Sequence, residues 1–80
     1  MHLKIKENIK EDDFNMILGS HENDFILDLG DVKYLSSKEI TKLLVLIKEH
    51  NKKIEFINCN EHIIETIKVL NLGEIIKLKI

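Results

Sequence analysis

The stretch FILDL, Phe25 to Leu29, decides the fold of this chain. It is apolar at every position except Asp28, and such a nearly unbroken apolar run is typical of a strand that is covered on both faces. Strands of this kind occur in parallel sheets with helices above and below. We therefore expect Phe25–Leu29 to be the central strand of a largely parallel sheet.

A helix is predicted directly downstream of this strand. After a turn at Gly30-Asp31, apolar residues recur three and four positions apart until the pattern ends near His50-Asn51. They form a single stripe: Ile40, Leu43, Leu44 and Ile47. At the start of the helix, Ser36 and Glu39 have the spacing of a capping box, in which each side chain accepts a hydrogen bond from the backbone N–H of the other residue.

The flanking sequence repeats this alternation of strand and helix. Further strands are predicted around Leu3 and Ile5, at Ile54–Ile57 and at Ile75–Ile80. One helix is expected to take its N-cap and first-turn acids from Glu11-Asp12-Asp13 and to end at Gly19, with three residues facing inward: Phe14, Ile17 and Leu18. Another helix is expected to be capped by Asn60 or Asn58, with four residues facing inward: Ile63, Ile64, Ile67 and Leu70. We expect residues 1–80 to form one α/β domain, with a four-stranded, mostly parallel or mixed sheet and about three helices.

Composition narrows the function classes. Lysines and acids alternate along the chain, the net charge is -2 and there is no arginine, so we expect neither specific nucleic-acid binding nor a basic tract for an anionic membrane. One cysteine, Cys59, fits a reducing compartment. No apolar run has the length of a signal peptide or a membrane span, so we expect a cytoplasmic protein that is neither exported nor inserted.

Three segments resemble the STAS (sulfate transporter and anti-sigma factor antagonist) family. DLGDVKYLSSKEI, from Asp28 to Ile40, resembles the family's buried strand, turn and Asp-Ser-Ser-Gly helix start. IEFINCN (Ile54 to Asn60) resembles the following strand and loop, and IKVLNLGEIIKL (Ile67 to Leu78) resembles the closing segment. The family pattern has one earlier strand and one later helix, so the resemblance implies a minimal STAS domain.

The resemblance also implies a function. STAS proteins of this type are bacterial signalling modules that bind another protein and need no cofactor or metal. It implies that the partner contacts the start of the second helix and the adjacent loops: Tyr34, Leu35, Ser36, Ser37, Lys38, Glu39 and Lys42. The partner expected first is an anti-sigma factor or a related switch kinase. The alternative is the ATPase of a lipid-transporting ABC system, on which a small STAS subunit docks.

One departure from the family bears on regulation. The residue that switch kinases phosphorylate in the family falls on Lys38, which cannot carry phosphate. The protein is then either permanently able to bind or is phosphorylated at Ser37 instead. A phosphate on Ser37 would lie at a helix N-terminus, where the helix dipole tolerates negative charge.

Several residues allow two interpretations. Ser36 and Glu39 act as a cap alone or also in partner binding. Asp28 is a buried carboxylate with a raised pKa and a chemical role, or it anchors a loop through backbone hydrogen bonds. Cys59 with His62 would suit a small enzyme or a metal site, but the spacing favours helix capping and an inert thiol. The short terminal strands leave an edge that can pair with another chain, so a homodimer is also an expectation.

Overall fold

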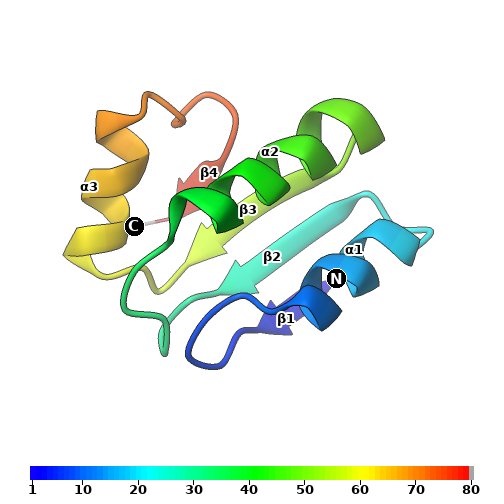
Figure 1. Cartoon of the computed structure of the whole chain (residues 1–80), viewed down its shortest axis with the longest axis horizontal. Coiled ribbons are helices and arrows are strands. Elements are labelled where there is room, and N and C mark those ends of the chain that lie inside the picture. Colours follow the sequence, from blue (N-terminus) through cyan, green and yellow to red (C-terminus); the bar gives the residue numbers. More distant parts are fainter. Residues whose placement is uncertain (80) are drawn as a thin grey trace.

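The computed structural model describes residues 1–79, which form a four-stranded, all-parallel sheet and three helices (Figure 1). The elements follow one another as β1 (His2–Lys4), α1 (Glu11–Gly19), β2 (Asp24–Asp28), α2 (Ser37–His50), β3 (Lys53–Ile57), α3 (Glu61–Val69) and β4 (Lys77–Lys79). The strands lie side by side in the order β1-β2-β3-β4. The predicted single α/β domain is therefore confirmed, with β1 at an edge of the sheet. Ile80, which the sequence assigns to the last strand, lies outside the described residues.

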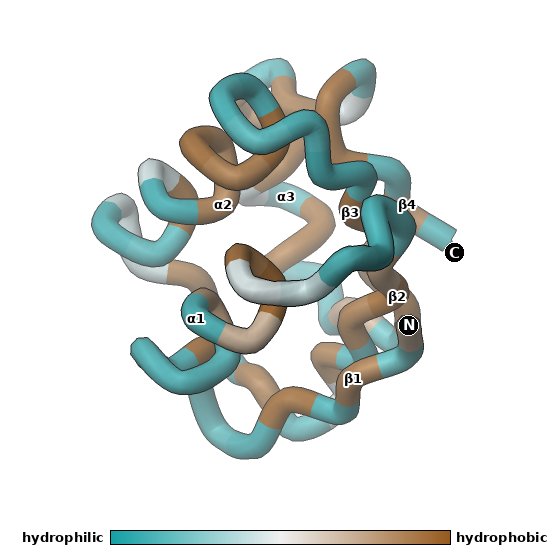
Figure 2. The backbone as a smooth tube through the Cα atoms, turned by 90° about the vertical axis from the view of Figure 1, so that its right-hand side faces the viewer, coloured by the Kyte–Doolittle hydropathy of each residue, from teal (hydrophilic) through white to brown (hydrophobic). Residues whose placement is uncertain are grey.

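All three helices lie on the same face of the sheet, as Figure 2 shows. Each crossover moves to the next strand in the same direction, and right-handed crossovers of this kind keep their helices on one side. The expectation of helices on both faces is therefore wrong. Burial along β2 alternates accordingly: Phe25 and Leu27 are fully buried under the helices, whereas Ile26 and Asp28 on the other face are only half-buried.

The face without helices is lined mainly by charged side chains. Opposite charges lie directly across from each other on neighbouring strands, in the pairs Lys4 with Asp28, Asp24 with Lys53, and Glu55 with Lys77. Cross-strand pairs of opposite charge stabilise a sheet, and their ionic groups are well hydrated. This composition explains why the domain can leave one face of its sheet uncovered.

The hydrophobic core fills the space between the sheet and the helices. Its fully buried side chains come from all three helices, from the strands and from the loops: Ile5, Ile17, Phe25, Leu27, Leu29, Val32, Leu43, Phe56, Ile63, Ile67 and Ile76. Two residues predicted to face inward do not. Leu18, in the last turn of α1, is 45% exposed, and Leu70, which follows the last residue of α3, is 50% exposed. Both helices are only nine residues long, so each buries a stripe shorter than the sequence pattern suggests.

The helix starts follow the local sequence closely. Asn60 caps α3, because its Oδ1 accepts a hydrogen bond from the Ile63 N–H at 2.9 Å. At α1 the N-cap is Lys10, so the prediction of an acidic N-cap is wrong. The acids occupy the first turn instead, and Asp13 accepts from the Lys10 N–H at 2.9 Å. α2 ends as predicted at His50, with Asn51 in the left-handed conformation.

A buried lysine, Lys52, joins the α1–β2 loop to the α2–β3 loop, at the end of the sheet where the strands begin. Lys52, directly before β3, is 6% exposed. Its ammonium donates to the backbone carbonyl oxygens of Ser20 at 2.9 Å and Glu22 at 2.8 Å, and it lies 5.7 Å from the centroid of the Phe25 ring. Lys52 therefore fastens the loop between α1 and β2 to the end of α2.

Candidate functional site

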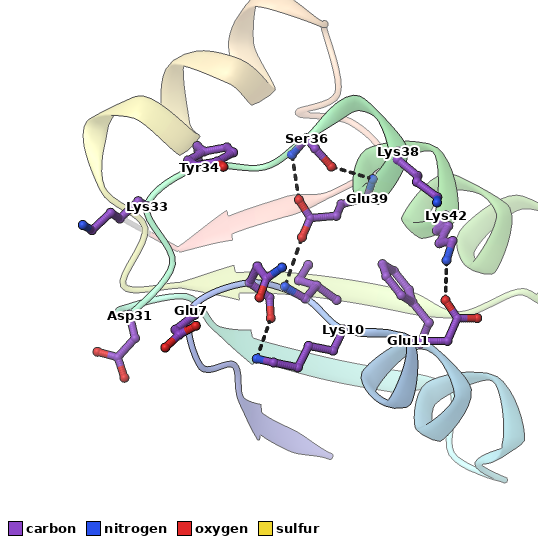
Figure 3. Close-up of a pocket in the computed structure, with 13 residues that line it drawn as sticks. Glu7, Lys10, Glu11, Asp31, Lys33, Tyr34, Ser36, Lys38, Glu39 and Lys42 are labelled. Atoms are coloured by element: carbon purple, nitrogen blue, oxygen red, sulfur yellow. Dashed lines mark hydrogen bonds and ion pairs between the residues drawn. The ribbon is translucent and has the colours of Figure 1, made fainter.

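A groove of about 880 Å³ lies at the edge of the sheet where the strands end and α1 and α2 begin (Figure 3). We call it the rim groove, and its lining residues are Glu7, Asn8, Ile9, Lys10, Glu11, Phe14, Asp31, Lys33, Tyr34, Ser36, Lys38, Glu39 and Lys42. They come from the β1–α1 connection, the β2–α2 connection and the N-terminal halves of the two helices. In open α/β sheets, ligands bind at this carboxyl edge.

Glu39 holds the two sides of the rim groove together. Its Oε1 accepts a hydrogen bond from the Ser36 N–H at 2.8 Å, and the Ser36 Oγ accepts from the Glu39 N–H at 3.2 Å. The predicted capping box is thus confirmed. The second carboxylate oxygen, Oε2, accepts from the N–H of Ile9, thirty residues away in the β1–α1 connection, at 3.1 Å. One carboxylate therefore links both loops that line the groove.

An ion pair crosses the groove between the first residue of α1 and the second turn of α2. The Lys42 ammonium donates to the Glu11 carboxylate and lies 5.3 Å from the centroid of the Phe14 ring. The pKa of Glu11 is lowered, first by this hydrogen bond, then by the charge of Lys42 and, to a smaller extent, by the charge of Lys38. Lys38 and Lys42 lie one helical turn apart on α2, so two ammonium groups share one carboxylate here.

The structure brings most of the predicted partner-binding residues to one place. Tyr34, Ser36, Lys38, Glu39 and Lys42 all line the rim groove. Tyr34 is 61% exposed, whereas the rings of the three phenylalanines are buried in the core. Among the described residues, an exposed aromatic ring is therefore found only at the rim groove.

Leu35 and Ser37 lie elsewhere. The side chain of Leu35, which was predicted to contact a partner, is only 7% exposed and packs in the core. Ser37, the first residue of α2, is exposed but does not line the groove. Within residues 1–79, its hydroxyl group takes part in no hydrogen bond, while its carbonyl oxygen accepts from the Thr41 hydroxyl at 2.9 Å.

Sequence reasoning missed the β1–α1 connection, which supplies Glu7, Asn8, Ile9 and Lys10 to the groove. A signal for this segment does exist. It follows a strand that is parallel to β2, and the connections that follow neighbouring parallel strands meet at one edge. The contact that closes the groove, between Glu39 and Ile9, is non-local and leaves no mark on the local sequence pattern.

Asp28 anchors the loop after β2. Its Oδ1 accepts hydrogen bonds from the Gly30 N–H at 3.0 Å and from the Asn58 side-chain amide at 3.1 Å. The Gly30 hydrogen bond, followed by that from Asn58, holds the pKa of Asp28 below its ordinary value. The interpretation as a loop anchor is therefore confirmed, and the interpretation as a carboxylate with a raised pKa is wrong.

The connection after β3 meets the same edge. The side-chain amide of Asn60 donates to the carbonyl oxygens of Val32 at 3.2 Å and Lys33 at 3.0 Å. Asn60 thereby joins the cap of α3 to the loop that carries Tyr34. Three successive connections are tied together at this edge, by Glu39 on one side and by Asn60 on the other.

Cys59 and His62, the residues that suggested an enzyme or a metal site, lie at the start of α3. Burial raises the pKa of the half-buried Cys59 thiol to about 11, and the negative charge of Asp28 adds to this effect. The thiol is therefore protonated at neutral pH. Among residues 1–79, no three His, Cys, Asp or Glu side chains are grouped closely enough to hold a metal ion.

Comparisons with known proteins add no family to these observations: no family model matches the chain. No curated protein matches it either. Among residues 1–79, none of the helices has the length and apolar character needed to cross a membrane.

Proposed function

We propose that this protein is a non-catalytic, STAS-like module that binds a partner protein through the rim groove and the start of α2. The observation that carries the proposal is Tyr34, a 61% exposed aromatic ring beside a groove whose two sides are already joined by Glu39. Tyrosine is enriched among the residues that contribute most to binding energy in protein interfaces. Loops that are already joined by internal hydrogen bonds also lose less entropy on binding.

The state of the polar groups in and near the groove supports binding rather than catalysis. Both carboxylate oxygens of Glu39 already accept backbone hydrogen bonds, so this group is not poised to take a proton from a substrate. The Cys59 thiol, with its raised pKa of about 11, lacks the thiolate character of a nucleophile. Glu39 instead stabilises the two loops of the groove, which is what a docking surface requires.

For the partner we propose an anti-sigma factor or a related switch kinase in the bacterial cytoplasm, on the STAS resemblance of Asp28 to Ile40. Lys38 stands where the family carries its phosphorylated residue. Regulation by phosphate then either is absent or uses Ser37, whose exposed hydroxyl can accept a phosphate without losing a hydrogen bond within residues 1–79. The second candidate partner is the ATPase of a lipid-transporting ABC system, for which no phosphorylated residue is needed.

Affinity capture from the source cells tests the proposal. Wild-type protein is compared with Tyr34→Ala, with Lys38→Asp and with Lys48→Asp, a control of the same charge change on an exposed residue in the last turn of α2. A partner at the groove is recovered by wild type and Lys48→Asp and lost with Tyr34→Ala. Its identity by mass spectrometry separates a kinase-like anti-sigma factor from a transporter ATPase. Equal recovery by all four proteins would refute a docking site at the groove.

A further inference from the structure

The acidic side chains of the rim groove are mostly engaged within the protein. Both oxygens of Glu39 accept backbone N–H groups, and Glu11 accepts from Lys42. The Asp31 carboxylate lies 3.8 Å from the Lys4 ammonium. Glu7 is the one acid of the groove for which residues 1–79 provide no such partner. Three of the four carboxylates of the groove therefore already have a partner within the protein.

The lysines of the rim groove, in contrast to its acids, mostly lack a charged partner. Within residues 1–79, neither Lys33 nor Lys38 forms an ion pair or donates a side-chain hydrogen bond. Lys10 donates only to the backbone carbonyl oxygens of Lys6 and Asn8 and has no carboxylate partner. The groove thus offers a ligand several ammonium donors.

Two of these donors flank Tyr34 in the chain. Lys33 directly precedes Tyr34 in the loop, whereas Lys38 lies in the first turn of α2, beyond Ser36 and Glu39 as seen from Tyr34 in Figure 3, with Lys42 one turn further along the helix. At the α2 end, Lys42 pairs with the Glu11 carboxylate, whereas the Lys38 ammonium has no carboxylate within ion-pair distance among residues 1–79. Among residues 1–79, a basic ligand would find one carboxylate of the groove without a partner, that of Glu7, whereas an acidic ligand finds two such ammonium groups, those of Lys33 and Lys38.

We propose, resting on the function proposed above, that the partner segment in the rim groove is an acidic peptide stretch, with Asp or Glu side chains against Lys33 and Lys38 and an apolar side chain against Tyr34. Charges at the rim of an interface select the partner and speed its association, while the aromatic contact supplies affinity. The charge complementarity of the groove thus defines the chemistry of the segment that fits it.

Titration of the ¹⁵N-labelled protein with two blocked pentapeptides tests this inference by NMR. One peptide has a leucine flanked by two glutamates on each side, and the other has the leucine flanked by two lysines on each side. We expect the acidic peptide to shift the amide signals of Tyr34 and Lys38 and to bind more weakly as salt is added. Lys38→Gln should raise its Kd about two- to fivefold, as for a single exposed charge pair, and Lys48→Gln should leave it unchanged.

Three outcomes would overturn the inference: stronger binding of the lysine peptide in the groove, shifts of the acidic peptide that fall outside the groove, or no binding of either peptide. These outcomes leave the proposed function standing if the captured partner still depends on Tyr34. Loss of that dependence refutes the proposed function, whatever the peptides do.

Discussion

Removing the Glu39 carboxylate should destabilise the whole domain. Glu39→Ala leaves the N–H groups of Ser36 and Ile9, both in partly buried surroundings, without their acceptor. Hydrogen bonds to charged groups contribute about 1.5 to 3 kcal/mol each and a helix cap about 1 kcal/mol, but water reaches part of this site, so we expect a total loss of about 2 to 3 kcal/mol. A domain of this size has a free energy of unfolding of about 4 to 12 kcal/mol, so the loss is a large fraction of it.

Urea unfolding followed by circular dichroism measures this effect. With an m value of about 1 kcal/mol/M for a small domain, the midpoint of Glu39→Ala should fall by about 2 M. Glu39→Gln keeps one carbonyl oxygen but turns its NH₂ group toward one of the two N–H donors, so it should lie between wild type and Glu39→Ala. The control is Glu49→Ala, an exposed residue at the other end of α2. A midpoint for Glu39→Ala that equals that of the control would refute the bridging role.

Three further predictions concern stability, pH and reactivity. Lys52→Met keeps the apolar stem of the side chain but leaves two loop carbonyl oxygens without their donor. It should lower the free energy of unfolding by about 1 to 3 kcal/mol, whereas Lys53→Met, at an exposed position, should lower it by less than about 0.5 kcal/mol. Equal urea midpoints for the two variants would contradict this prediction. Because the folded pKa of Asp28 lies below its ordinary 3.8, its stabilising contribution is present above that pH and is lost as the pH falls through the folded pKa. Asp28→Asn should therefore be more destabilising at pH 6 than at pH 2, and an equal difference at both values would count against the loop anchor. With a pKa of about 11, Cys59 should react with iodoacetamide at pH 8 about a hundredfold more slowly in the folded protein than in denaturant; similar rates would show an accessible thiolate.

Features that depend on neighbouring residues in the chain were predictable from the sequence. The Ser36 and Glu39 capping box, the Asn60 cap and the end of α2 at His50 all involve contacts within one or two turns. The order of strands and helices follows from the same local patterns. For this reason the class of fold and the start of α2 as a candidate site were both predicted.

Features that depend on the path of the chain could not be predicted from the sequence. Ile26 makes the β2 run continuously apolar, yet it lies on the face that no helix covers, because the strand order puts all three crossovers on the other side. Leu35 follows an exposed tyrosine in the same loop but packs in the core. The half of the groove formed by the β1–α1 connection depends on the contact of Glu39 with Ile9, which a local pattern does not encode.

The central claim is that a partner protein docks at the rim groove, and photo-crosslinking in the source cells tests it most directly. A photoreactive amino acid replaces Tyr34 in one variant and Met16 in another; Met16 is 51% exposed on α1 and does not line the groove. We predict a discrete adduct with one protein from position 34 and none from position 16. The absence of an adduct from position 34, or the same adduct from both positions, would contradict a docking site at the groove.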